Sequence, residues 1–202
     1  MKVIGITGGV GAGKTRILEY LKDREDSRII IADQVAHRLE EPGEVCYEQI
    51  VAMLGREILT SDGRIDKGRM AARIFDDKEV LAWINEIVHP AVKAYIRHEI
   101  AEAKKAGILR YLFIEAALLI EDGYGQIVDE MWYIHADEGI RRERLRVNRG
   151  YSDEKIDKLM RRQLSEDAFY RQCSVVIENS GAFAGVCRQI DEKLGEDLCQ
   201  KQ

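Results

Sequence analysis

Gly8-Gly9-Val10-Gly11-Ala12-Gly13-Lys14-Thr15 is the stretch that decides the fold, and it directly follows the apolar run Val3-Ile4-Gly5-Ile6. It matches the phosphate-binding pattern G-x-x-x-x-G-K-[ST], in which a strand turns sharply into a helix. Glycines let the backbone wrap a phosphate without Cβ clashes, so that several N–H groups point at one spot. Lys14 adds a positive charge, and the Thr15 hydroxyl can bind a magnesium ion that bridges phosphate oxygens. The stretch predicts a protein that uses a nucleoside triphosphate, rather than a glycine-rich turn with no ligand.

Short apolar runs alternate with helical stretches along the rest of the chain. The expected strands are residues 2–7, 28–32, 110–114, 130–135 and 174–177. This alternation is typical of a parallel sheet covered by helices on both faces, and the β-branched runs suit burial on both sides. We therefore predict an α/β fold with a central five-stranded parallel sheet flanked by helices.

A long helical stretch, residues 34–107, separates the second expected strand from the third. It is far longer than a crossover between parallel strands requires. Apolar residues from Ile84 to Ala103 keep near-helical spacing, which predicts one long amphipathic helix that runs past Pro90. We interpret the stretch as a subdomain that covers the substrate.

Two carboxylates follow predicted strands. Asp33 closes the apolar run 29–32, and Glu115 follows the strand 110–114. Ligands of an open parallel sheet sit outside the carboxyl ends of its strands, so both residues should share an edge with the phosphate loop. Asp33 could take a proton from an acceptor hydroxyl or cap the next helix, and its position leaves both roles open. Glu115 could orient magnesium through water, contact substrate, or be a solvated strand end.

Seven arginines crowd residues 141–162. On a helix, Arg142, Arg146 and Arg149 fall at i, i+4 and i+7 and share a face. Arginine forks bind phosphate oxygens in pairs and neutralise charge as a phosphoryl group transfers. The cluster therefore predicts a phosphate-binding function beside the loop.

The alternative for any single arginine of this cluster is a solvated ion pair with Glu138, Glu143 or Asp153. The residues after the cluster have helical apolar spacing as well. We interpret residues 138–166 as a helical hairpin that can close as a lid.

Composition bounds the class of protein. The chain has 202 residues, enough for a large core, and a formal net charge of −5, which argues against a general nucleic-acid binder. Cys46, Cys173, Cys187 and Cys199 have no C-x-x-C spacing and are interpreted as reduced thiols. No apolar stretch approaches the ~20 residues that cross a bilayer. We expect a cytoplasmic protein, a monomer or a small homo-oligomer, with neither nucleic acid nor membrane as partner.

Two further features fit ordinary structural roles. His37, His89, His98 and His135 show no metal-ligand spacing, and His135 at a strand end is interpreted as a structural histidine. The turn Asn179-Ser180-Gly181 follows the last strand, where its backbone could meet a nucleobase or form only a turn.

Taken together, these residues resemble the dephospho-CoA kinase family, whose members phosphorylate the ribose 3′-hydroxyl of dephospho-CoA with ATP. The resemblance extends over nearly the whole chain. It rests on residues 6–15, 32–36, 41–43, 74–75, 88–90, Leu118-Leu119 with Glu121, Arg149, Gln163 and 176–181. Many families share the phosphate loop alone, but the ordered set is specific.

The resemblance implies a P-loop kinase that uses ATP and Mg²⁺ on a small-molecule partner, dephospho-CoA. Residues 34–107 would form the helical substrate subdomain and residues 138–166 the helical lid. The expected nucleotide contacts are Gly9, Gly11, Ala12, Gly13, Lys14, Thr15 and Arg16 at the phosphates, with Thr15 also on the metal, and Asn179 near the adenine.

The same resemblance implies the catalytic and substrate contacts. Asp33 matches the general base of the family, Lys14 holds phosphate, and Arg149 would stabilise the phosphoryl group in transfer. The expected substrate contacts are Asp33, His89, Glu115 and Gln163.

The chain also departs from the family pattern. Glu115-Ala116-Ala117 stands where the family usually has Asp-Val-Pro, and the loop ends in Lys14-Thr15-Arg16 instead of Lys-Ser-Thr. Threonine keeps the hydroxyl that binds magnesium, so the chemistry should survive. The arginines before Gly150 are spaced loosely enough that Arg144 or Arg146 could take the role of Arg149.

Two other functions are compatible with parts of the sequence. Another P-loop small-molecule kinase, acting on a nucleoside or nucleotide, would share the loop, Asp33 and a basic lid. A nucleotide-dependent switch would fit Asp122-Gly123-Tyr124-Gly125, which has the D-x-x-G spacing of GTPases, but the sequence contains no N-K-x-D motif that reads guanine.

Overall fold

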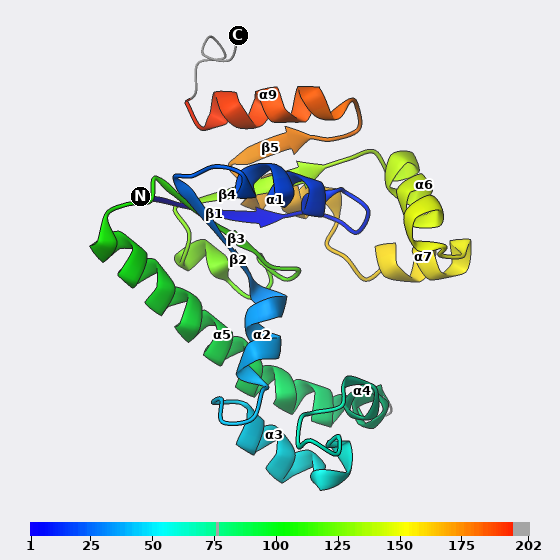
Figure 1. Cartoon of the computed structure of the whole chain (residues 1–202). Coiled ribbons are helices and arrows are strands. Elements are labelled where there is room, and N and C mark those ends of the chain that lie inside the picture. Colours follow the sequence, from blue (N-terminus) through cyan, green and yellow to red (C-terminus); the bar gives the residue numbers. More distant parts are fainter. Residues whose placement is uncertain (76, 196–202) are drawn as a thin grey trace. The chain divides into compact units, whose positions relative to one another are not determined.

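A computed structural model describes residues 1–75 and 77–195 and divides into two compact units (Figure 1). The first unit combines Met1–Ile29 with the chain from Ile108 onward, and the second is Ile30–Gly107. Cys199 lies outside the described residues.

Within the described ranges, no helix is both long enough and apolar enough to cross a membrane.

The predicted five-stranded parallel sheet is present. Its strands are β1 (Lys2–Thr7), β2 (Ser27–Ile31), β3 (Tyr111–Glu115), β4 (Glu130–His135) and β5 (Val175–Glu178), in the spatial order β2-β3-β1-β4-β5. β1 pairs in parallel with β3 and β4, and β4 pairs in parallel with β5. β1 and β4 have the predicted bounds, and the other three strands are shifted by a single residue. The α/β fold prediction is confirmed.

Helices connect and flank the strands of the first unit. They are α1 (Lys14–Lys22), α6 (Glu138–Arg149), α7 (Asp153–Met160), α8 (Glu166–Gln172) and α9 (Phe183–Lys193), with a short 3₁₀ turn η2 (Tyr124–Gln126). α8 is in contact with β4, and α9 with β5. Five consecutive residues of β1 are buried, as expected for a strand covered on both faces. The Tyr133 ring on β4 stacks on Phe169 of α8, with centroids 4.7 Å apart.

The helical hairpin predicted after β4 is also present. α6 and α7 pack against each other beyond the carboxyl end of β4 (Figure 1). The left-handed Gly150 ends α6, and the Ser152 hydroxyl caps α7 by accepting from the Lys155 N–H. A role of residues 138–166 as a lid stays a prediction.

In its described residues, the second unit contains the last two residues of β2, helices, and the isolated β-bridge between Leu59 and Ile65. It contains α2 (Ala32–Leu39), α3 (Tyr47–Leu54), η1 (Arg56–Ile58), α4 (Lys67–Phe75) and α5 (Lys78–Ala106). α5 runs past Pro90, as predicted, and packs on α2 and α4. Asp77 caps its start, and a left-handed Gly107 ends it. The structure thus separates residues 30–107, close to the predicted range 34–107, whose role with substrate stays a prediction.

Candidate functional site

The phosphate loop leaves β1 and enters α1 through glycines in unusual backbone conformations. Gly11 and Gly13 have φ angles of 80° and 89°, a region that favours glycine. Gly13 is the N-cap of α1 and supplies no side-chain capping bond, so the first N–H groups of the helix keep no side-chain acceptor there. Such a helix start attracts anions.

Gly8, Gly11 and Gly13 are also required for close packing of the loop. A Cβ atom on Gly8 would lie 2.5 Å from the Ile134 carbonyl oxygen, and one on Gly11 would lie 2.7 Å from that of Arg141. A Cβ atom on Gly13 would lie 2.5 Å from the Asn179 amide nitrogen. The loop therefore packs closely against β4, α6 and the turn after β5.

Lys14 and Glu115 meet at the edge of the sheet, as the strand order predicts. Lys14 Nζ donates to the Gly8 carbonyl at 2.7 Å and lies 3.9 Å from Glu115 Oε1. Glu115 is the last residue of β3 and pairs in register with Ile6 of β1. Thr15 is exposed at the second position of α1. The Lys14 ammonium, the Glu115 carboxylate and the Thr15 hydroxyl thus lie at or near the start of α1.

Two arginines of α6 donate hydrogen bonds to backbone carbonyl groups of the loop. Arg141 Nε donates to the Val10 carbonyl at 3.0 Å, and Arg144 Nη1 donates to the Ala12 carbonyl at 3.4 Å. Arg144 Nη2 also donates to the Asn179 carbonyl at 2.8 Å. These hydrogen bonds hold the carbonyls from one side and so support the loop conformation that presents the amides.

Gln163 and Asn179 complete this support. Gln163 Oε1 accepts from the Val10 N–H at 3.1 Å and from Arg141 Nη2 at 3.0 Å. Asn179 is 4% exposed, and its Nδ2 donates to the Ala12 carbonyl at 2.7 Å. The structure therefore brings both predicted residues to the loop, where each binds its backbone.

The other arginines of α6 lie elsewhere. Arg142 pairs with Glu138 and Asp157, and Arg146 pairs with Glu143 and Asp153. The ion-pair alternative considered for single arginines is thus confirmed for these two.

Arg149 is the last residue of α6 and is exposed. Its hydrogen bond to the Tyr151 hydroxyl lowers the pKa of that phenol. Across the described ranges, its side chain makes no hydrogen bond to residues 8–15. The residues of α6 that contact the loop are Arg141 and Arg144, and the catalytic role of Arg149 stays a prediction.

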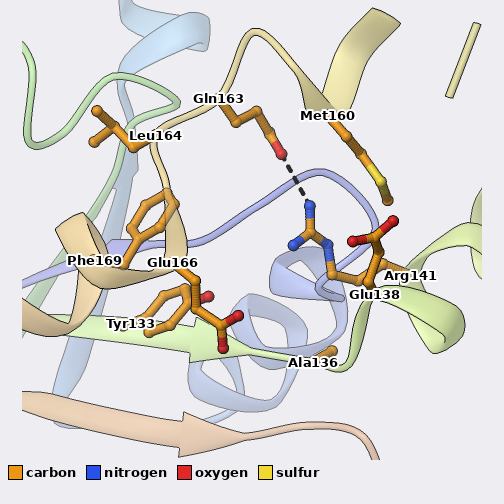
Figure 2. A pocket seen from close by; sticks show the side chains of 9 residues that line it. All are labelled: Tyr133, Ala136, Glu138, Arg141, Met160, Gln163, Leu164, Glu166 and Phe169. Carbon is orange, nitrogen blue, oxygen red and sulfur yellow. Dashed lines mark hydrogen bonds between the residues drawn. The ribbon is translucent and has the colours of Figure 1, made fainter. Parts of the chain in front are cut away.

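A small pocket opens beside the loop, between β4, α6 and the segment that joins α7 to α8 (Figure 2). Its volume is about 180 Å³. The residues that line it are Tyr133, Ala136, Glu138, Arg141, Met160, Gln163, Leu164, Glu166 and Phe169. Figure 2 shows the hydrogen bond between Arg141 and Gln163 at one wall, so the pocket and the phosphate loop share these two side chains.

Asp33 and His89 belong to the second unit. Asp33 lies in the first turn of α2, and the N-cap of that helix is Ile31, so the capping alternative for Asp33 is wrong. The Asp33 carboxylate is exposed and accepts no hydrogen bond from residues 1–75 or 77–195. His89 is half-buried on α5, which packs on α2. That Asp33 shares an edge with the phosphate loop, and that both residues contact substrate, stays a prediction.

Comparison with known proteins identifies the relatives of the chain. A sequence profile described as dephospho-CoA kinase matches residues 2–184. A protein named dephospho-CoA kinase from Carboxydothermus hydrogenoformans is 32% identical over 190 residues, which cover 94% of this chain and 91% of that protein.

Solved structures share the fold. A crystal structure of a Thermus thermophilus protein superposes with a TM-score of 0.78 at 25% identity, covering 96% of both chains. A dephospho-CoA kinase from Campylobacter jejuni superposes with a TM-score of 0.73 at 18% identity, covering 96% of this chain and 95% of the other. The second likeness concerns the fold alone.

Proposed function

Because the chain belongs to the dephospho-CoA kinase family, we propose that it transfers the γ-phosphoryl group of ATP to the ribose 3′-hydroxyl of dephospho-CoA. The products are coenzyme A and ADP, and the reaction is the last step of coenzyme A biosynthesis, in the cytoplasm. The observation that carries the proposal is the phosphate loop, whose carbonyls are held by Arg141, Arg144 and Asn179.

The loop and the start of α1 bind the triphosphate. The contacts come from the backbone N–H groups of Gly9, Gly11, Ala12, Gly13 and Arg16 and from the Lys14 ammonium. Asn179 stands beside the adenine. Lys14 already lies at the carboxyl edge of the sheet, 2.7 Å from the Gly8 carbonyl, so a phosphate can take the place of that acceptor.

The residues at this edge fit a magnesium ion. Mg²⁺ prefers hard oxygen ligands, and the exposed Thr15 hydroxyl follows Lys14 directly, while Glu115 lies within 3.9 Å of Lys14. Thr15 would hold the metal through its hydroxyl, and Glu115 would orient its water or the substrate. When bound, the ion neutralises charge on the transferring phosphate.

Asp33 is the general base. Its exposed carboxylate has no hydrogen-bond donor in the described part of the chain, which leaves it available to a substrate hydroxyl. It aligns the ribose hydroxyl and accepts its proton as the oxygen attacks in line. His89 and the remainder of residues 34–107 surround the acceptor.

Residues 138–166 close over the phosphates and exclude water that would hydrolyse ATP. Gln163 contacts substrate from the pocket wall, and Arg149 neutralises charge on the phosphoryl group once the lid is closed. Arg141 and Arg144, which contact the loop in the structure, hold it in shape.

A coupled assay with ATP, magnesium and dephospho-CoA tests the proposal directly. We expect ADP release that depends on dephospho-CoA, and a product whose new phosphate is on the ribose 3′-oxygen. The same assay with a panel of nucleosides and nucleotides tests the other small-molecule kinase. Preferential phosphorylation of a nucleoside would replace our proposal, and tight GTP binding without any acceptor would favour a switch.

A further inference from the structure

Arg16, in the first turn of α1, lies against Phe183, the first residue of α9. The Arg16 Cζ atom is 4.0 Å from the centre of the Phe183 ring. Arg16 is exposed, whereas Phe183 is half-buried. Among residues 1–75 and 77–195, no group accepts a hydrogen bond from the Arg16 side chain. An aromatic ring therefore supports the guanidinium, and its N–H groups stay open to a ligand.

The Phe183 ring is held by contacts between α1 and α9. Tyr20, one turn after Arg16, meets the ring edge-on, with centroids 6.2 Å apart and an interplanar angle of 90°. The Tyr20 hydroxyl donates to Asp191 Oδ1 of α9 at 2.7 Å, and Arg24 pairs with the same carboxylate at 3.2 Å. Because the ring is packed between the two helices, it restricts the positions that the Arg16 guanidinium can take.

Lys14 and Arg16 reach in opposite directions from the start of α1. Lys14 Nζ lies 3.9 Å from Glu115, the last residue of β3. Arg16 meets Phe183 of α9, which packs on β5. In the sheet, β3 and β5 lie on opposite sides of β1. The two cations can therefore meet different parts of one ligand that lies across the loop.

Asn179 indicates which part of the ligand lies on the β5 side. Its Nδ2 donates to the Ala12 carbonyl at 2.7 Å, and a Cβ atom on Gly13, the N-cap of α1, would lie 2.5 Å from the same nitrogen. The proposed function has the adenine beside Asn179 and the terminal phosphates at Lys14. A triphosphate bound in this direction has its α-phosphate, the one joined to the nucleoside, nearest to Arg16.

We propose that the Arg16 side chain, supported by the Phe183 ring, binds the α-phosphate of the nucleotide. The family loop usually ends in Lys-Ser-Thr, so Arg16 stands where the family has a neutral threonine. A guanidinium offers the phosphate a full charge and paired N–H donors, which form stronger hydrogen bonds than a neutral hydroxyl does. The inference rests on the proposed function for the direction of the nucleotide, but not for the identity of the acceptor.

Arg16→Met tests the charge, because methionine keeps an unbranched apolar stem but has neither charge nor N–H groups. The measurement is the dissociation constant of ATP, ADP, AMP and adenosine, as the ratio of variant to wild type. Calorimetry serves for ATP and ADP, and competition against ADP for the other two. We expect a ratio of about ten for the three nucleotides and about one for adenosine, which has no phosphate.

Three further variants separate charge, support and general stability. Arg16→Lys keeps the charge on a single ammonium, so its ratio for ADP should be about three. Phe183→Leu keeps an apolar contact but removes the aromatic face, and should also give about three. The matched control is Arg110→Met, because Arg110 also lies over a ring, 5.4 Å from that of Tyr111, but directly precedes β3, at the opposite end of that strand from Glu115. Its ratio should be about one.

The ligand series decides which group Arg16 meets. A ratio of about one for ADP overturns the proposal. An equal loss for adenosine would assign Arg16 to the nucleoside, and a loss for ATP alone would assign it to the γ-phosphate; both also overturn it.

The ³¹P spectrum of bound ADP provides a second readout, which does not depend on affinity. Between wild type and Arg16→Met at saturating ADP, the α-phosphorus resonance should shift more than the β resonance. An unchanged α resonance overturns the proposal. A protein with the expected ratios that phosphorylates no dephospho-CoA would support this inference and refute the acceptor in the proposed function.

Discussion

The phosphate loop and the first turn of α2 differ in how far their polar groups are already bonded within the protein. Around the loop, Arg141, Arg144 and Asn179 all bind backbone carbonyls. At the start of α2, the Asp33 carboxylate is exposed and accepts no hydrogen bond from the described residues. The loop uses its polar groups internally, which holds its shape, whereas the carboxylate that we propose as the general base is left open to a ligand.

The largest effect that this comparison predicts is at Asp33. Asp33→Asn should lower kcat by about 10² or more at nearly unchanged ATP affinity, because the amide cannot accept the proton but leaves the loop intact. Steady-state kinetics with varied ATP measure both quantities. Gln34→Ala, at the exposed neighbouring position, serves as the control with normal kcat. Near-normal turnover of Asp33→Asn would exclude Asp33 as the base.

The next effect lies within the loop. Gly11→Ala should weaken ATP binding by about 30-fold, since φ is 80° there and the new Cβ atom would meet the Arg141 carbonyl oxygen. Gly139→Ala on α6 is the control, because a Cβ atom there meets nothing within 4 Å. Equilibrium binding of ATP to both variants makes the comparison. Equal affinities would mean that the loop does not need its observed shape.

A smaller effect distinguishes the two sets of arginines on α6. Arg144→Ala should raise the ATP dissociation constant about tenfold, because the Asn179 carbonyl loses the Arg144 donor and the Ala12 carbonyl keeps only the Asn179 amide. Arg146→Ala should stay within about twofold, since its partners are the surface carboxylates Glu143 and Asp153. If both substitutions weaken ATP equally, Arg146 also reaches the nucleotide.

The smallest effect concerns the exposed pairs themselves. Arg142→Ala removes ion pairs with Glu138 and Asp157. It should shift the Tm by no more than about 2 °C, and the shift should shrink further in high salt. Thermal unfolding at low and high ionic strength measures it. A large shift in Tm that salt does not reduce would group Arg142 with Arg141 and Arg144, the arginines that hold the phosphate loop.

The fold was predictable from local patterns in the sequence. β1 and β4 are apolar runs with clear ends, and their predicted bounds match the structure. The periodic spacing of apolar residues predicts α5 through Pro90, which a simple helix-breaking rule would have cut. The loop itself is identified by its spacing, which places glycines where the backbone needs them.

The support of the loop was harder to predict because it depends on which face of α6 meets residues far away in sequence. Helical spacing groups Arg142, Arg146 and Arg149, but Arg141 and Arg144 are the ones that contact the loop. Their acceptors are backbone carbonyls, which no side-chain pattern reveals. Arginines three positions apart, on the face that also carries the buried Leu145, were the available signal.

The amide of Gln163 has two unequal sides. Its oxygen accepts from both Val10 and Arg141, which fixes the orientation of the group, and in the described part of the chain its NH₂ donates no hydrogen bond. Gln163 also lines the pocket beside the loop. An oxygen atom of a small molecule in the pocket could accept a hydrogen bond from that NH₂. The molecule would then be connected to the loop through the planar amide of Gln163, and no existing hydrogen bond would have to break. The same side chain would then contact both the molecule in the pocket and the backbone of the loop.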